Sequence, residues 1–373
     1  MQSGIAAAET VGHNEDLLKQ LLLRLPARSL IRFKCVSKLW LSLISSPKFC
    51  ESHTLQNPIP KFSSATTDAT TWFISLLPNP NLNFIPDPQG LMILQSCNGL
   101  LLCTSPADKF TISRQFKFYV VNPTTSRFSE IALPPPSPTK PEPARLLSVA
   151  LAFDPSKSLH YKLVCVSGSS TVSVHREIEI EIYSSETRTW RACKSAHMRF
   201  PTIGEFLPGV YCNGRIHWFS RFCWLVHYDI DEGHYGVVGL PGHDFSVERE
   251  CICFGESGGR LHLIEMYGNG IGLNKLHVLE MGKDYSGWFV KYRVDLNLMT
   301  AFPYTPAASC HPFFFLDVEE NEEQNPVIVL RIGDKFISYN IRDKSCKTLR
   351  DLFSHPVIGW RDAYQYMETL ACV

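Results

Sequence analysis

The sequence predicts an α+β multidomain chain with a small all-α module over residues 12–57 and a large all-β domain over residues 58–373. Two observations support this division. Leucines near the amino end recur with helical spacing, whereas after residue 57 short runs of β-branched and aromatic residues alternate with proline, glycine and asparagine. In addition, turn dipeptides recur through the second part at intervals of ~40 to 55 residues, which indicates a repeated β unit.

The first predicted helix begins at Asn14, whose side chain can cap the amino end, and it stops before Pro26. Glu15 and Asp16 suit the positive end of the helix dipole. The apolar positions fall on one broad stripe of a helix with 3.6 residues per turn. They are Leu17, Leu18, Leu21, Leu22 and Leu25.

Further short helices are expected over residues 27–36 and 37–44, and a fourth begins after Ser46 with Pro47 at its first position. Leu30, Phe33 and Val36 share the spacing of one helical face, and Trp40 lies on the next helix. Three or four short helices in so few residues make a marginal core. The apolar surplus therefore predicts that helices of a partner protein cover part of the module.

The second part reads as short strands joined by turns. Asn98-Gly99, Asn213-Gly214 and Gly258-Gly259 each precede a strand, and later strands of each unit end in Asp or Asn. Five such units run from about residue 90 to 352. Segments 72–77 and 364–370 are expected to pair and complete another unit, which leaves no open edge. We therefore expect a β-propeller of about six blades, with a β-sandwich as the alternative.

The amino-acid composition limits the possible binding partners of the protein and its cellular compartment. Lys plus Arg equals Asp plus Glu at 36 each, so the overall charge favours neither nucleic acid nor an anionic membrane surface as a partner. The first ten residues lack a leader-like apolar run, and the 13 cysteines are irregularly spaced. We expect free thiols in a cytoplasmic and/or nuclear protein, with no cofactor and no metal.

Catalytic motifs are weak in this sequence. Residues 255–259 read Gly-Glu-Ser-Gly-Gly, which matches the nucleophile elbow of hydrolases, but an alternating strand follows where the elbow requires a helix. A hairpin turn is the better interpretation. Asp154, Asp229 and Asp317 recur near strand ends and would be the acids of a propeller hydrolase, although turn chemistry explains them as well. No enzymatic activity is therefore predicted.

The amino-terminal module resembles the F-box of plant F-box proteins. The matching positions follow the order of that motif over about a tenth of the chain. They are Asp16-Leu17-Leu18, Leu21-Leu22, Arg24-Leu25-Pro26, Arg28-Ser29-Leu30, Arg32 to Lys38, Trp40, Ser42 to Ser45 and Pro47-Lys48-Phe49. One position departs, because Asn14-Glu15 stand where the motif often opens with Leu-Pro.

The large domain is similar to the F-box-associated propeller regions of the same proteins, and it is not a full kelch repeat. The resemblance rests on short pieces in order along most of the chain. They include Ser96 to Leu102, Val121 to Thr125, Ala152 to Pro155, Tyr161 to Val164, Ile182 to Ser185 with Trp190, Gly209 to Tyr211 and Gly214 to Trp218.

The resemblance implies a non-catalytic substrate receptor. The F-box would bind a Skp1-type adaptor, the adaptor would link it to a cullin-RING ubiquitin ligase, and the propeller would hold a target protein that the sequence does not name. An F-box scaffold acting outside the ligase, or a propeller hydrolase, is the alternative. The residues expected to bind the adaptor are Leu17, Leu18, Leu21, Leu22, Leu25, Pro26, Leu30, Phe33, Val36 and Trp40. Candidate aromatic residues for the target are Phe222, Trp224, Phe245, Tyr267, Tyr285 and Trp288, which could equally be core residues of strands.

Overall fold

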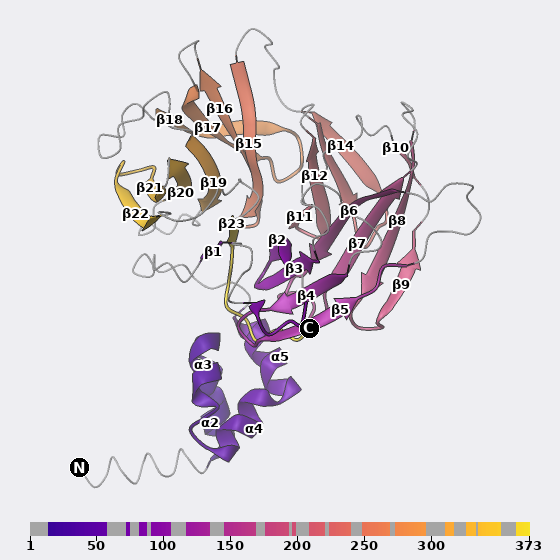
Figure 1. Ribbon diagram of the computed structural model, residues 1–373, viewed down its shortest axis with the longest axis vertical. Helices are drawn as coiled ribbons and strands as arrows, with labels where there is room; N and C mark the ends of the chain where they lie inside the picture. Colours follow the sequence, from indigo (N-terminus) through magenta and orange to yellow (C-terminus); the bar gives the residue numbers. More distant parts are fainter. Residues whose placement is uncertain are drawn as a thin grey trace.

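A computed structural model of the protein shows a helical module below a ring of β-sheets (Figure 1). The structure describes residues 14–57, 72–74, 82–87, 91–105, 117–134, 145–168, 176–193, 196–198, 209–220, 224–239, 248–268, 273–295, 310–316, 326–332, 335–351 and 363–373.

The four expected helices are present. They are α2 (Glu15–Leu22), α3 (Ala27–Phe33), α4 (Lys38–Ser45) and α5 (Pro47–Gln56). Three begin with a side-chain cap: Asn14 accepts from the amide of Leu17 at 3.1 Å, Ser37 from that of Trp40 at 3.2 Å, and Ser46 from that of Phe49 at 3.2 Å. None of the helices in the described part of the chain is long and apolar enough to cross a bilayer.

The remaining elements form five antiparallel sheets, which we call blades 1 to 5. Blade 1 contains β2 (Met92–Cys97), β3 (Leu100–Thr104), β4 (Phe118–Asn122) and β5 (Arg127–Ile131). Blade 2 contains β6 (Arg145–Ala152), β7 (Lys162–Gly168), β8 (Arg176–Ser184), β9 (Thr189–Ala192) and β10 (Ala196–Met198), the last two both pairing with β8. Blade 3 contains β11 (Val210–Cys212), β12 (Arg215–Ser220), β13 (Trp224–Asp229) and β14 (Tyr235–Gly239). Blade 4 contains β15 (Glu248–Ser257), β16 (Arg260–Gly268), β17 (Leu273–Met281) and β18 (Trp288–Asp295). Blade 5 contains β19 (Cys310–Leu316), β20 (Val327–Ile332), β21 (Lys335–Asn340) and β22 (Cys346–Asp351).

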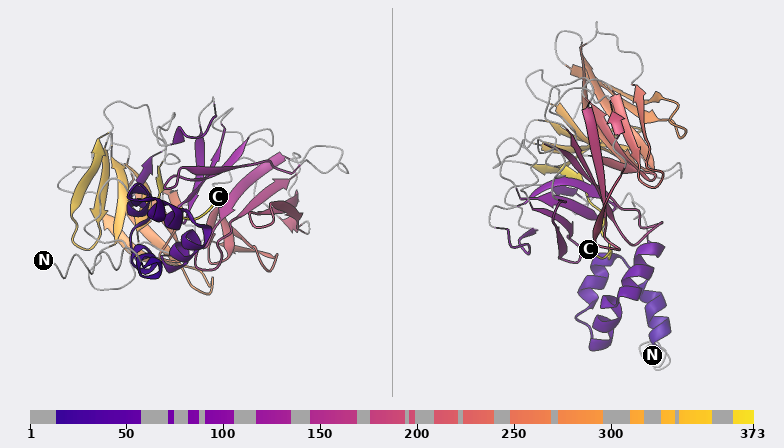
Figure 2. Two further views of the ribbon diagram at one scale, coloured as in Figure 1. Left: turned by 90° about the horizontal axis from the view of Figure 1, so that it is seen from below. Right: turned by 90° about the vertical axis from the view of Figure 1, so that its right-hand side faces the viewer.

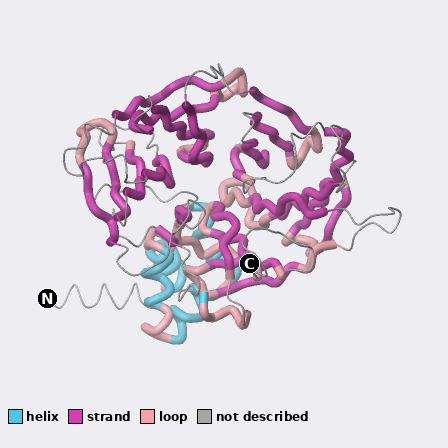
Figure 3. The backbone as a smooth tube through the Cα atoms, turned by 45° about the horizontal axis from the view of Figure 1, so that its top comes forward, coloured by secondary structure: helices cyan, strands magenta, loops and turns pink. Residues whose placement is uncertain are grey.

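The blades are arranged around a ring (Figure 3). Each of β2, β6, β11 and β15 contacts the first strand of the next blade. Separate clusters of buried apolar side chains lie between blades 1 and 2, 2 and 3, 3 and 4, and 4 and 5. The stability of the ring therefore comes from face-to-face packing of neighbouring sheets rather than from one central core.

The ends of the propeller close the ring, but not with a sixth blade. β1 (Trp72–Ile74) pairs with β23 (Ala363–Gln365), and β23 contacts both β2 of blade 1 and β19 of blade 5. The expected pairing of the two segments is confirmed. The expected count of about six blades is wrong, because in the described residues this ribbon has two strands of three residues each and the blades number five.

The repeated turn dipeptides close the first hairpin of blades 1, 3 and 4. Asn98-Gly99, Asn213-Gly214 and Gly258-Gly259 all have positive φ, which a two-residue hairpin turn of this kind requires. The amide of Asn98 also donates to Phe153 O of blade 2 at 2.7 Å, and that of Asn213 donates to Gly259 O of blade 4 at 3.0 Å. Each Asn-Gly therefore shapes a turn and ties one blade to the next. The hairpin expected at residues 255–259 is confirmed by the pairing of Ser257 with Arg260.

The carboxyl-terminal segment, residues 366–373, joins the propeller to the helices. Tyr366 packs with blade 1, Leu370 is buried among the helices of the module, and Ala371 is buried in the cluster between blades 1 and 2. The buried amide of Asn122 donates to Thr369 O at 3.1 Å and to Ala371 O at 2.8 Å. The chain thus ends at the junction of its two domains, as the right view of Figure 2 also shows.

Asn122 has a matched counterpart in blade 5, which allows its contact with the carboxyl-terminal segment to be tested. Both Asn122 and Asn340 end the third strand of a blade and accept two amide protons of the following turn. Only Asn122 also binds the carboxyl-terminal segment. We expect Asn122→Ala to lower the free energy of unfolding by about 1–3 kcal/mol more than Asn340→Ala, because the carbonyls of Thr369 and of buried Ala371 lose their donor. Urea unfolding followed by far-UV circular dichroism measures the difference, and equal losses would contradict it.

Candidate functional site

The helical module buries only part of its leucine stripe. Leu18, Leu22 and Leu30 are almost fully buried and pack with Ile44 and Phe49. Leu25, Phe33 and Trp40 are half-buried around this core, and the rings of Phe33 and Trp40 meet edge to face with centroids 5.5 Å apart. These six of the ten predicted adaptor residues therefore hold the module together to different degrees.

The other side of the stripe faces outward. Leu17 and Leu21, one turn apart on α2, are 42% and 50% exposed, and Val36 is 57% exposed. Pro26, which precedes α3, is exposed as well. Six of the nine exposed large hydrophobic residues in the described part of the chain belong to residues 14–57. Such a concentration of exposed apolar side chains is typical of a docking surface.

Two further leucines of the module are exposed, and the sequence reasoning missed them. Leu39 and Leu41 on α4 are 40% and 48% exposed, on either side of the half-buried Trp40. Trp40, Leu43 and Ile44 follow the i, i+3, i+4 spacing of the buried face, so the positions of Leu39 and Leu41 off that face could have been read from the sequence. We call the exposed set of Leu17, Leu21, Val36, Leu39 and Leu41 the leucine surface.

The module is positively charged, with seven Lys and Arg against three Asp and Glu in residues 14–57. Arg24, Arg32 and Lys38 are exposed. Arg28 is exposed too, and its side chain lies 3.8 Å from Glu368 of the carboxyl-terminal segment. An apolar surface with a basic surround fits a partner that is apolar in the centre and acidic at its edge.

Comparisons with known proteins agree with this arrangement. A family model described as "F-box domain" matches residues 14–52, and one described as "F-box protein At3g26010-like, beta-propeller" matches residues 60–354. The chain is an F-box protein with a β-propeller. It is 34% identical to the Arabidopsis thaliana F-box protein At5g07610 over 94% of this chain and 88% of that protein. The A. thaliana F-box/kelch-repeat protein At3g23880 is 26% identical over 61% of this chain and 64% of its own length.

Solved structures resemble the F-box protein more distantly. A chain from the structure titled "Crystal Structure of Mitotic Checkpoint Complex" aligns with a TM-score of 0.38 and 13% identity, over 80% of this chain and 90% of that chain.

The candidate target residues lie on two different faces of the propeller. The turn at Asn98-Gly99 touches the carboxyl-terminal segment, since a Cβ on Gly99 would lie 2.6 Å from Met367 O. The turns of blades 3 and 4 at Asn213 and Gly259 contact each other on the same face. Because β16 and β17 are antiparallel, the turn that carries Tyr285 shares this face, whereas Tyr267 lies at the opposite end of blade 4.

The six candidates differ in environment as well. Trp288 is 8% exposed and packs between blades 3 and 4, which is the core role the sequence left open. Tyr267 is half-buried, with its hydroxyl donating to Glu265. The backbone of Trp224 begins β13 at the face away from the helices. Phe222 and Phe245 lie outside the described residues.

Tyr285 belongs to a packed aromatic cluster between blades 3 and 4. Its ring stacks on that of His217 with centroids 5.6 Å apart, and its hydroxyl lies 2.9 Å from His217 Nε2. The guanidinium of Arg215 lies 4.8 Å from the Tyr285 ring. Burial lowers the pKa of His217 to about 3, so this histidine is neutral near neutral pH. Through these contacts with His217 and Arg215 of β12, Tyr285 holds the β17–β18 turn against blade 3.

One buried carboxylate in blade 4 has three basic side chains around it. Glu280 is 4% exposed and lies 3.1 Å from Arg260, 3.1 Å from His262 Nε2 and 2.6 Å from Lys291. Burial alone would raise the pKa of Glu280, but the hydrogen bonds from His262 and Lys291 outweigh it and hold the pKa at about 2. A carboxylate held ionised by three partners acts as a structural cross-link between strands.

The acids at strand ends cap turns. Asp154 accepts from the amide of Ser156 at 3.1 Å, and Asp229 accepts from the amides of Asp231 and Glu232. Asp229, Glu232 and His234 each bring one possible metal-ligand atom within 4.8 Å of the others. However, the carboxylate of Asp229 already accepts the amide protons of that turn and forms an ion pair with Arg215 at 3.0 Å. Turn chemistry accounts for both aspartates, and Asp317 lies outside the described residues.

Neighbouring leucines of α2 test the division between core and surface. We expect Leu22→Ala to destabilise the helical module by about 2–4 kcal/mol, because it leaves a cavity at a site that is 1% exposed. Leu21→Ala, at a site that is 50% exposed, should change stability by less than about 0.5 kcal/mol. Thermal unfolding with limited proteolysis of the module measures both, and equal effects would contradict the assignment.

The charge cluster of blade 4 predicts a pH dependence. Because the folded pKa of Glu280 lies below its ordinary value of 4.5, its contribution to stability is present above pH 4.5 and is lost as the pH falls toward 2. The stability advantage of the wild type over Glu280→Gln should therefore shrink between pH 5 and pH 3. Urea unfolding of both proteins across this range measures it, and a pH-independent difference would show that the ionised form is not favoured.

Proposed function

We propose that this F-box protein is the substrate-recognition subunit of a Skp1-cullin-F-box ubiquitin ligase. The observation that carries the proposal is the leucine surface, which stays exposed while the rest of the F-box stripe forms the module's own core. The F-box would dock a Skp1-type adaptor through this surface, and the propeller would hold a target protein. The chain itself would act as a receptor and not as the enzyme.

The leucine surface supports adaptor docking by its chemistry. Leu17 and Leu21 lie one turn apart on α2, while Leu39 and Leu41 lie on α4. The i, i+4 spacing of Leu17 and Leu21 places both on one helix face, which fits an apolar groove of a partner protein. The basic residues around them would steer an acidic adaptor toward the module.

The mechanism that follows is one of proximity. A target held on the propeller and an adaptor held on the F-box become parts of one assembly, so that transfer of ubiquitin from a loaded E2 is nearly intramolecular. The carboxyl-terminal segment, which contacts both the module and the propeller, would keep the target at a constant distance and orientation from the adaptor.

For the target, we propose the face of the propeller away from the helices. The other face carries the helical module and would be crowded further by a bound adaptor. Tyr267 and the start of β13 at Trp224 lie on the open face, and Tyr285 and Trp288 lie on the crowded one, where they contribute to packing between blades. The open face also leaves a target free to approach the rest of a ligase.

Adaptor binding can be tested against the fold of the module. We expect Leu17→Lys and Leu21→Lys each to weaken binding to a Skp1-family adaptor at least tenfold, because a leucine buried at an interface contributes ~1.5–3 kcal/mol. Leu55→Lys is the matched control, since Leu55 on α5 is 47% exposed but lies outside the leucine surface. Biolayer interferometry with purified proteins measures the affinities.

The measured adaptor binding distinguishes a ligase receptor from an F-box scaffold that acts outside the ligase. Failure of the wild-type protein to bind any Skp1-family adaptor would overturn the proposal. Binding of the adaptor without recruitment of a cullin would instead favour an F-box scaffold that acts outside the ligase.

A further inference from the structure

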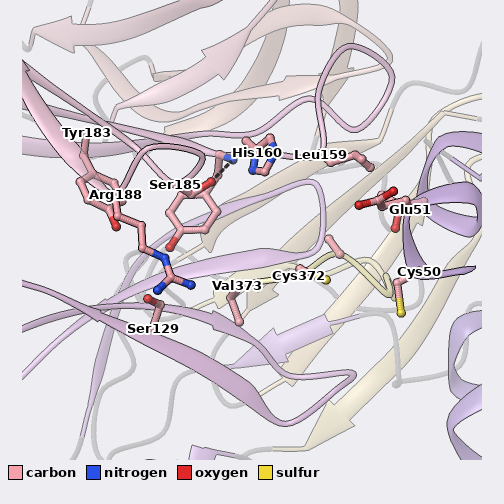
Figure 4. Close-up of a pocket in the computed structure, with 13 residues that line it drawn as sticks. Cys50, Glu51, Ser129, Leu159, His160, Tyr183, Ser185, Arg188, Cys372 and Val373 are labelled. Carbon is pink, nitrogen blue, oxygen red and sulfur yellow. Dashed lines mark hydrogen bonds between the residues drawn. The ribbon is translucent and has the colours of Figure 1, made fainter. Parts of the chain in front are cut away.

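A cavity lies where the F-box, blades 1 and 2 and the carboxyl-terminal segment meet (Figure 4). Its volume is about 180 Å³. The side chains that line it include Cys50 of α5, Cys372 of the carboxyl-terminal segment, and His160 and Arg188 from turns of blade 2. Because one water molecule occupies ~30 Å³ in the liquid, the cavity can admit small polar molecules.

Two cysteines from opposite ends of the chain share this cavity. Cys50 is half-buried on α5, Cys372 is exposed, and both are free thiols. Figure 4 shows them on adjacent segments, at the end of the cavity away from Arg188. Leu370 is 2% exposed within the helical core, so the segment that carries Cys372 is held against the module. The fold therefore maintains the proximity of the two thiols.

The two thiols also differ in ionisation. The Cys50 thiol donates to Ile44 O at 3.5 Å. The adjacent Cys50 thiol and the positive charge of Arg127 lower the pKa of Cys372 to about 6 against the opposing effect of burial. The same contact with Cys372, and burial, raise the pKa of Cys50. Cys372 is therefore the more readily deprotonated thiol of the two. A low-pKa exposed thiolate beside a second thiol is the arrangement found at redox-sensitive cysteines.

Other cysteines of the propeller are in a different environment. Cys97 and Cys103 are buried in blade 1, and burial raises the pKa of both thiols. Burial likewise raises the pKa of Cys253 in blade 4 to about 12. Such thiols stay protonated and shielded, so an oxidant that reaches the protein should react with Cys372 before them.

We propose that Cys50 and Cys372 form a peroxide-sensitive modification site, in which oxidation produces a disulfide between the F-box and the carboxyl-terminal segment. The Cys372 thiolate attacks one oxygen of hydrogen peroxide, the O–O bond breaks, and the hydroxide that leaves takes up a proton to form water. The Cys50 sulfur then attacks the sulfenic acid on Cys372; the thiol proton and the leaving hydroxide form a second water. Two thiols have lost two electrons to one peroxide.

The cross-link would make the junction between the domains covalent. It would close a loop from residue 50 to residue 372, and it would act at the place where Leu370 already inserts among the helices. A disulfide stabilises mainly by restricting the unfolded chain, and more so for a long loop. The oxidised protein should therefore hold its F-box more rigidly on the propeller. This proposal does not depend on adaptor binding, and its test uses the full chain alone.

The test treats the reduced full-length protein with hydrogen peroxide and maps the products by mass spectrometry of peptides under non-reducing conditions. The expected product is a cross-linked peptide that contains Cys50 and Cys372, lost on addition of dithiothreitol. Thermal unfolding of the oxidised protein should shift upward by about 5 °C. Cys35→Ser is the matched control, because Cys35 is exposed in the same module and its thiol donates to Arg32 O; it should form the same cross-link.

The variant Cys50→Ala tests the role of the second thiol. Cys50→Ala removes the second thiol beside Cys372, so peroxide should leave a sulfenic acid on Cys372 that dimedone traps. In the same variant the pH midpoint for alkylation of Cys372 should rise from about 6 toward the ordinary thiol range. Absence of the Cys50–Cys372 peptide from the oxidised wild type, or an unchanged alkylation midpoint in Cys50→Ala, would overturn the proposal.

Discussion

The insertion of the last eight residues between the F-box and the propeller is the interaction on which the rest of this structure depends. Asn122 holds the segment by two hydrogen bonds, and Leu370 and Ala371 enter two separate apolar clusters only one residue apart. Just before it, β23 pairs with β1 and contacts both the first and the fifth blade. A single stretch of chain thus closes the ring and fixes the helical module on it.

This constraint also explains how the F-box can keep so many leucines exposed. Four short helices bury little surface by themselves, and the module gains part of its core from Leu370 of the distant carboxyl end. With that core completed by Leu18, Leu22 and Leu30, the outer leucines are not needed for folding. They remain available for a partner, which is the property a docking module requires. The same packing brings Cys50 and Cys372 to one cavity.

Much of the fold could be predicted where the signal is local. The caps at Asn14, Ser37 and Ser46 and the positive-φ turns at Asn98-Gly99 depend on neighbours within four residues, so the sequence shows them directly. The number of blades was predicted less well. Whether the paired ends become a full sheet or a two-stranded ribbon depends on how neighbouring blades fill the ring, and strand spacing along the chain carries no such information.

The amino-acid sequence by itself determined the order of the helices, the hairpin turns and the F-box motif, because periodicity, capping and turn chemistry act over a few residues. It did not decide which members of the leucine stripe face solvent, since Leu21 and Leu22 are chemically identical and differ only in what packs against them. Nor did it place Tyr267 and Tyr285 on opposite faces of the propeller, or Cys372 beside Cys50. Those relations join residues up to 322 positions apart, from Cys50 to Cys372, and only the closed ring with its inserted carboxyl end brings them together.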